Sequence, residues 1–174
     1  MDQNNLKGIR LEEAVGKLFE RQGYANVQLD RLMKGTSGAT HEIDVYGEKI
    51  TKSGLWRRSA RTGAAECKYK ANGMKVEKKE VSDFVVKLHD LSIDYGVFVT
   101  TSSFTEDATN LAKYYNVETM DARISNEMFK KNGIDYYSRI HHLGIKVDGP
   151  AVDAARTVVD IADKLGILKA VFGN

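Results

Sequence analysis

The sequence contains a single cysteine and no long apolar run, and each of these two features excludes a class of protein. The single cysteine, Cys67, permits no internal disulfide and is typical of a reducing compartment, so we expect a cytoplasmic protein. No apolar run approaches the roughly 20 residues that span a bilayer, which excludes insertion into a membrane. The first residues have neither a basic head nor an apolar stretch, so we expect no secretory signal.

The chain also lacks a strong excess of either charge. Its 26 Lys and Arg residues nearly balance its 24 Asp and Glu residues, and the net charge of +2 does not by itself indicate nucleic-acid binding. The distribution of charge is more informative, because the segment from Lys49 to Arg61 has basic residues around a tryptophan and contains no acidic residue. Such a patch suits phosphate and base-stacking contacts, although a solvated hairpin would have the same composition. The predicted DNA-binding residues are Lys52, Trp56, Arg57, Arg58, Arg61 and Lys70.

With 174 residues, the chain is long enough for one hydrophobic core and short for two. We expect a domain over residues 1–122 and a helical C-terminal extension over 123–174, packed on the domain or at a dimer interface. The apolar stripe from Val152 to Ala162, which follows the only proline, supports the helical assignment.

Hydrophobic periodicity predicts an alternation of helices and strands. The expected helices are 6–22 and 78–91, together with a third helix that begins with a capping box formed by Ser103 and Glu106 and ends at Tyr115. The expected strands are 25–33, 41–50, 64–70, 95–100 and 117–120, with a long hairpin or loop over 52–63. The order αβββαβαβ predicts an α/β fold with a central mixed sheet, whose first three strands are antiparallel and whose faces are both covered by helices.

The tripeptide Glu66-Cys67-Lys68 is the strongest chemical signal. Alternation along a strand places Glu66 and Lys68 on one face and turns Cys67 toward the core. On the neighbouring strand we expect Ile43 and Val45 to share the buried face, leaving Glu42, Asp44 and Tyr46 opposite. If Asp44 lies beside Glu66, two carboxylates can hold a hard cation such as Mg²⁺. A solvated ion pair on a half-exposed strand is the alternative for Glu66 and Lys68.

These motifs together resemble the PD-(D/E)xK nuclease superfamily, and within it the Mrr-like restriction endonuclease catalytic domain. Leu11-Glu12 stands at the position of a Phe-Glu pair in the family's first helix, and residues 97–105 resemble its strand-to-helix signature. The resemblance covers residues 6–122. It implies a restriction-endonuclease-like fold and a metal-dependent DNA endonuclease that hydrolyses phosphodiester bonds, with Mg²⁺ as cofactor and Mn²⁺ able to replace it.

The resemblance also implies roles for individual residues. Asp44, Glu66, Lys68 and Glu12 become the catalytic residues, and the metal ligands become Asp44, Glu66 and the backbone carbonyl of Cys67. The chain departs from the pattern at Ile43, where the superfamily's name has proline, and at Glu66, where Mrr proteins often have Gln.

Two further functions remain open. Archaeal Holliday-junction resolvases share the same arrangement of acids and lysine, so branched DNA is an alternative substrate, and a nuclease-like module that binds DNA without cutting is another. No separate amino-terminal DNA-binding domain is expected, which leaves target selection open. Because cutting both strands requires two centres, we expect a homodimer.

Overall fold

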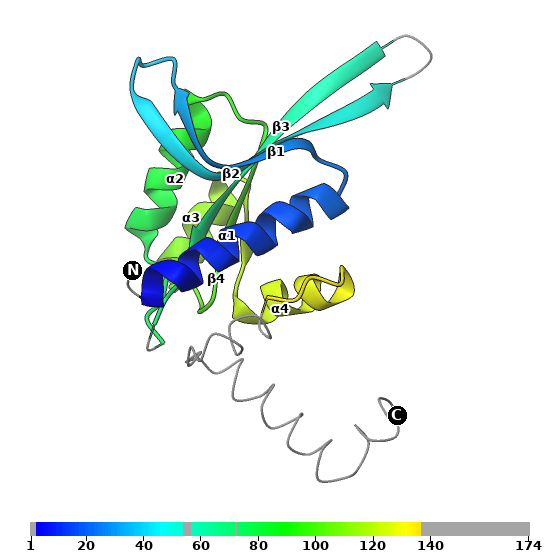
Figure 1. Ribbon diagram of the computed structural model, residues 1–174. Coiled ribbons are helices and arrows are strands. Elements are labelled where there is room, and N and C mark those ends of the chain that lie inside the picture. Colours follow the sequence, from blue (N-terminus) through cyan, green and yellow to red (C-terminus); the bar gives the residue numbers. More distant parts are fainter. Residues whose placement is uncertain (1–2, 54–56, 72, 137–174) are drawn as a thin grey trace, which may run out of the picture.

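The computed structural model describes residues 3–53, 57–71 and 73–136, which form one mixed β-sheet with helices on both faces (Figure 1). The elements in chain order are α1 (Gln3–Arg21), β1 (Ala25–Lys34), β2 (Thr40–Ser53), β3 (Arg57–Lys68), α2 (Lys78–Asp90), β4 (Tyr95–Thr100), α3 (Glu106–Tyr114), β5 (Val117–Met120) and α4 (Ala122–Lys131). This confirms the predicted order, and α4 lies at the start of the segment that was predicted to be a helical extension. The predicted extension is described only as far as residue 136, so residues 137–174 of it lie outside the described part.

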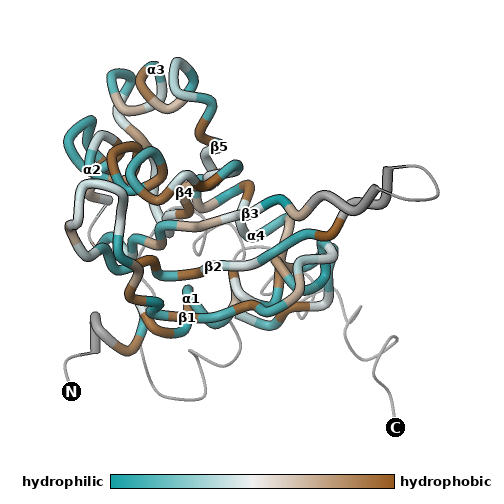
Figure 2. Tube along the Cα trace, turned by 90° about the horizontal axis from the view of Figure 1, so that it is seen from above, coloured by the Kyte–Doolittle hydropathy of each residue, from teal (hydrophilic) through white to brown (hydrophobic). Residues whose placement is uncertain are grey.

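The sheet has the strand order β1-β2-β3-β4-β5. β1, β2 and β3 pair antiparallel, whereas β4 and β5 join in parallel after the crossover helices α2 and α3. Figure 2 shows α2 and α3 on one side of the strands and α1 on the other. Among the helices of the described residues, none is long and apolar enough to cross a bilayer.

Helix α1 forms because its apolar residues recur along one face. Leu11, Val15, Leu18 and Phe19 follow the spacing of an amphipathic helix and are buried against the sheet. Burial of each large side chain contributes roughly 1.5–3 kcal/mol. The helix ends before Gly23, which has φ +86°, a conformation that glycine adopts without strain. This face of the sheet, which α4 also covers, holds one core cluster, and the face under α2 and α3 holds a second.

The capping box predicted at Ser103 is wrong. Helix α3 begins at Glu106, and its N-cap is Thr105, whose side chain accepts a hydrogen bond from the backbone N–H of Ala108. Ser103 lies before the helix, where its carbonyl accepts the N–H of Val76 at 2.9 Å. This pairing connects segments far apart in sequence, so the local Ser-x-x-Glu pattern does not reveal it.

The prediction that Ile43 and Val45 share one buried face is also wrong. Both are buried, but Val45 packs in the cluster under α1, whereas Ile43 packs with Tyr46 in the cluster under α2 and α3. The two-residue alternation of β2 is therefore broken between Ile43 and Val45, at Asp44.

The alternation breaks where a side-chain carboxylate replaces the backbone of β2 as the hydrogen-bond acceptor for β3. The Cα register between β2 and β3 stops at Val45, which faces Ala65. One residue further, the Asp44 carboxylate accepts the backbone N–H of Cys67 at 2.7 Å. On the other side of β2, Asp30 lies between two paired residues of β1 and has φ +51°, a value uncommon for a residue other than glycine. Two neighbouring strands are thus irregular at the same level of the sheet.

The far ends of β2 and β3 project from the body as a two-stranded arm (Figure 1). This confirms the hairpin expected over 52–63, although β3 begins seven residues earlier than the predicted strand at 64. Near the base of the arm, Gly47 faces Gly63, and the ring of Tyr24 lies against both. A Cβ on Gly63 would lie 2.6 Å from a ring carbon of Tyr24, so the close approach requires glycine.

Candidate active site

Asp44 and Glu66 meet where β2 and β3 separate. The hydrogen bond from the Cys67 N–H fixes the Asp44 carboxylate next to the residue that follows Glu66. Glu66 itself is buried, with 7% of its side chain exposed, and it faces Phe98 of β4 in the sheet register. Adjacent strands therefore bring the two predicted carboxylates together, as the sequence indicated.

Both carboxylate oxygens of Glu66 are occupied by ammonium groups. Oε1 lies 2.9 Å from the Nζ of Lys68, which confirms that these two side chains share a face. Oε2 lies 2.8 Å from the Nζ of Lys87, which reaches Glu66 from α2. Because a buried carboxylate is costly without partners, this double pairing offsets the cost of burying Glu66.

Two carboxyl groups near Glu66, those of Asp44 and Glu12, have raised pKa values. Burial, followed by the negative charge of Glu66, raises the pKa of Asp44 to about 6, against the lowering effects of the Cys67 N–H and the two lysines. Burial, followed by the charge of Asp44, raises the pKa of Glu12 to about 7, with smaller effects from Asp30 and Glu42. Glu12 on α1 therefore belongs to the same electrostatic group as the strand carboxylates.

Lys68 keeps its charge at neutral pH. Burial alone would lower its pKa, but the hydrogen bond to Glu66 and the charges of Glu66 and Asp44 outweigh burial and raise it. About 40% of the Lys68 side chain is exposed, so its ammonium group is open to a solvent-borne ligand. This lysine can stabilise negative charge but does not act as a base in its resting state.

Cys67 has a structural position, as predicted. Its side chain is buried in the core under α1, and burial, followed by the charges of Asp44, Glu12 and Glu66, raises the pKa of its thiol well above the usual value. The thiol is therefore neutral and unsuited to soft-metal binding. The predicted part of Cys67 in a metal site is its backbone carbonyl, which stays a prediction.

The donor set fits a hard divalent cation. Carboxylate oxygens are the ligands that Mg²⁺ prefers, and burial, followed by neighbouring negative charge that a cation would neutralise, raises the pKa values of Asp44 and Glu12. Across the described residues, no three His, Cys, Asp or Glu side chains are placed to hold a metal together. The side-chain ligands predicted here are two, Asp44 and Glu66, and water would complete the coordination.

Lys87 is the site residue that the sequence reading missed. It lies three residues after Phe84 on α2, so helical periodicity places it beside the buried face and explains why only 23% of it is exposed. A charged residue at the border of an apolar stripe was the available signal. Its partner could not be found from the sequence, because the approach of α2 to β3 depends on tertiary packing.

The predicted DNA-binding residues are only partly described. Arg61 is exposed on β3 and faces Lys49 across the arm. Lys70 is instead paired with Glu80 of α2, at 2.8 Å. Trp56 lies outside the described residues, as do the side chains of Lys52, Arg57 and Arg58, so their role stays a prediction.

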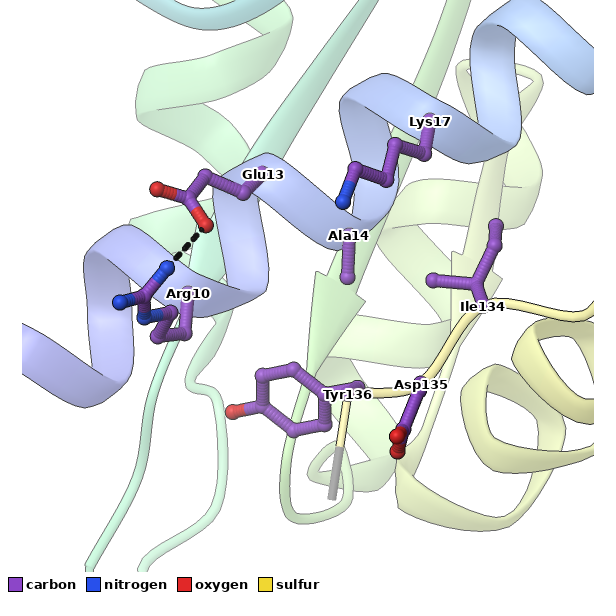
Figure 3. A pocket seen from close by; sticks show the side chains of 7 residues that line it. All are labelled: Arg10, Glu13, Ala14, Lys17, Ile134, Asp135 and Tyr136. Atoms are coloured by element: carbon purple, nitrogen blue, oxygen red, sulfur yellow. Dashed lines mark hydrogen bonds and ion pairs between the residues drawn. The ribbon is translucent and has the colours of Figure 1, made fainter. Parts of the chain in front are cut away.

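A small cavity lies away from this centre. It occupies about 20 Å³ between α1 and residues 134–136, enough for a single water. Figure 3 shows its lining, with the Arg10–Glu13 ion pair of 2.7 Å at one side and Tyr136 at another. None of the predicted catalytic residues lines it, so this cavity is not assigned to catalysis.

A protein-family model matches most of the chain. The model of the Mrr catalytic domain, described as a restriction endonuclease, matches residues 3–129. A search of curated proteins found no match.

Solved structures with a similar fold include three at low sequence identity. AF1548, solved as a protein of unknown function, is 16% identical with a TM-score of 0.57, and the match covers 72% of this chain and 66% of that one. The DNA modification-dependent restriction endonuclease AspBHI is 19% identical with a TM-score of 0.52, covering 76% of this chain and 36% of that one. The restriction endonuclease MspJI, solved in complex with a 27-mer oligonucleotide, is 17% identical with a TM-score of 0.54, and the match covers 76% of this chain and 31% of that one. The chain thus spans about a third of the length of these two endonucleases.

Proposed function

This chain belongs to the Mrr-type restriction endonuclease family and has a restriction-endonuclease-like fold, and on that premise we propose that it is a metal-dependent DNA endonuclease. The centre consists of Asp44, Glu66 and Lys68, with Glu12 beside it. The observation that carries the proposal is the meeting of Asp44 and Glu66 on adjacent strands, with Lys68 paired to Glu66 at 2.9 Å. The cofactor proposed is Mg²⁺, which Mn²⁺ can replace.

In this proposal Asp44, Glu66 and the Cys67 carbonyl hold the metal. When bound, Mg²⁺ would polarise the scissile phosphate and lower the pKa of a coordinated water. Asp44 is suited to this role because its carboxylate is fixed by the Cys67 N–H and needs no reorientation. Glu66 is fixed in the same way by its two ammonium partners.

Lys68 acts on the phosphate. Its protonated ammonium group is partly exposed and lies on the same face as Glu66, where it stabilises the negative charge that develops as the phosphodiester is attacked. Glu12, with a pKa of about 7, is largely ionised only in mildly alkaline solution and then adds a carboxylate beside Asp44. We assign it to orienting the attacking water.

The basic arm is the proposed DNA contact. Arg61 and Lys49 face each other near its base, and the remaining basic residues of the patch follow toward its tip. Ammonium and guanidinium groups in such a position bind the phosphate backbone without reading sequence.

The test is cleavage of DNA by the purified chain. Supercoiled plasmid and a synthetic four-way junction are incubated with Mg²⁺ or with EDTA, and the plasmid is supplied both methylated and unmethylated. We expect nicking that needs Mg²⁺ and falls at least a hundredfold in Asp44→Ala, whereas Asp83→Ala on the outer face of α2 cuts like the unchanged protein.

Each part of this experiment tests one alternative function. Undiminished cutting by Asp44→Ala would refute the proposed centre. Selective symmetric cutting of the junction would indicate a resolvase, and DNA binding without any product would indicate a non-cleaving module. A preference for methylated plasmid would extend to this chain the modification dependence that AspBHI carries in its name.

A further inference from the structure

Lys87 is placed where a metal ion is proposed to bind. Its Nζ lies 2.8 Å from Glu66 Oε2, and 77% of its side chain is shielded from solvent, as is 93% of that of Glu66. The contact spans 21 residues and joins α2 to β3. A long-range ion pair this enclosed differs from the exposed pairs on the same helix, such as Lys79–Asp83, which are 84% and 60% exposed.

Helix α2 is held at both ends, so the position of Lys87 is determined by the fold. At its start, Glu80 completes a capping box with Glu77 and pairs with Lys70, which follows β3. At its end, Asp90 accepts hydrogen bonds from Ser37 and lies 2.6 Å from His41, in the connection from β1 and the start of β2. The helix that carries Lys87 is thus fastened to the strands that carry the carboxylates.

The two lysines on Glu66 differ in what else they can reach. Lys68 is 40% exposed and is available to a phosphate, whereas Lys87 is more enclosed and its ammonium group points to Glu66. A divalent cation that takes Glu66 as a ligand must displace at least one of these ammonium groups from its oxygen. Displacing Lys87 leaves the pairing of Lys68 intact.

We infer that Lys87 is a competing cation, which holds Glu66 Oε2 in the metal-free protein and lowers the affinity of the site for its divalent ion. This inference rests on the proposed metal-dependent nuclease centre. The physical reason is that metal binding must break a charge-assisted hydrogen bond and bring a second positive charge close to an ammonium group. Lys87 is therefore a positioning residue for Glu66, and the affinity for the metal is the property that it controls.

The experiment is a calorimetric titration of the purified chain with Mn²⁺ at about pH 8, without DNA. At this pH Asp44 is ionised, so competition from protons is small. We expect Lys87→Met to bind Mn²⁺ about tenfold more tightly, which corresponds to about 1.4 kcal/mol. Lys79→Met, on the exposed face of the same helix, is the matched control and leaves the Kd unchanged.

A second variant and a second readout keep the test decisive if Lys87→Met folds poorly. Lys87→Arg retains the charge and offers a bidentate fork to the carboxylate, so we expect several-fold weaker Mn²⁺ binding. In EDTA, Lys87→Met should melt at a lower temperature than the unchanged protein, and saturating Mn²⁺ should raise its Tm by more. Equal or weaker Mn²⁺ binding by Lys87→Met, or tighter binding by Lys87→Arg, would overturn the inference.

The failure of the inference can be told from the failure of the proposed function. An unchanged protein that neither binds Mn²⁺ nor cuts DNA would remove the proposed function. An unchanged protein that binds Mn²⁺ and cuts, while Lys87→Met binds no more tightly, would remove only the role of Lys87.

Discussion

Asp44 shows how one side chain can serve both the sheet and the site. Its carboxylate accepts the Cys67 N–H at the point where the backbone register of β2 and β3 ends. The sequence predicted that Asp44 and Glu66 would lie on neighbouring strands, because strand alternation and order are local properties. The break in alternation at Asp44 was not predictable, since it depends on an acceptor that reaches across to another strand.

The hydrogen bond at Asp44 gives a stability prediction. Asp44→Ala leaves the Cys67 N–H without its acceptor, which costs about 1–3 kcal/mol, whereas the amide oxygen of Asp44→Asn can still accept it. Both variants should lose DNA cleavage, but only Asp44→Ala should unfold at clearly lower urea concentration. Equal unfolding midpoints for the two variants would show that this hydrogen bond does not contribute to stability.

The raised pKa values of Asp44 and Glu12 predict how pH affects the metal-free protein. The folded pKa values, about 6 and about 7, lie above the ordinary values of 3.8 and 4.5, so folding favours the protonated forms. The stability they provide is complete below about pH 4 and is lost as pH rises through 6 and 7. The Tm in EDTA should therefore fall between about pH 4 and pH 7, and Asp44→Asn should reduce this fall. Identical pH profiles for Asp44→Asn and the unchanged protein would contradict the shift at Asp44.

Among the elements, the order of helices and strands was predictable, but the ends of the elements were less so. Periodicity located α2 and β4 closely, because their apolar residues repeat at clear intervals. It placed the start of β3 too late, since the polar, basic arm has no apolar alternation. It misplaced the cap of α3, since the pairing of Val76 with Ser103 is invisible to local patterns.

The base of the arm gives a prediction at this scale. Gly63→Ala would place a methyl group 2.6 Å from a carbon of the Tyr24 ring, so the ring or the strand must shift, at a cost of roughly 1–3 kcal/mol. Gly8→Ala on α1 is the control, because nothing lies within 4 Å and alanine favours the helix by roughly 0.5–1 kcal/mol. Chemical unfolding should therefore show opposite shifts for the two variants. A Gly63→Ala variant as stable as the unchanged protein would mean that Tyr24 does not pack tightly there.

On the scale of the whole molecule, one sheet carries two cores, and the proposed site lies between them. Asp44 breaks the alternation of β2 between the two faces, Glu12 approaches from α1, and Lys87 approaches from α2 on the other side. Composition and motif order predicted the sheet and its strand carboxylates. They could not predict which helix residues would meet the carboxylates, because that depends on how α1 and α2 pack.

The oligomeric state gives a prediction at this scale. Cutting both DNA strands requires two centres, and one chain supplies one, so we expect a two-fold dimer when DNA is bound. Sedimentation velocity with a short duplex and Ca²⁺, which is expected to support binding without cutting, should show two chains per duplex. A strictly monomeric species over the accessible concentration range would remove the dimer.

The most direct measurement is the anomalous diffraction of a crystal soaked in Mn²⁺. A peak within coordination distance of the carboxylates of both Asp44 and Glu66, with the Lys87 ammonium group moved away from Glu66, is the predicted result. Full soaking with no peak between these two carboxylates, or a peak at another place in the molecule, would contradict the proposed centre.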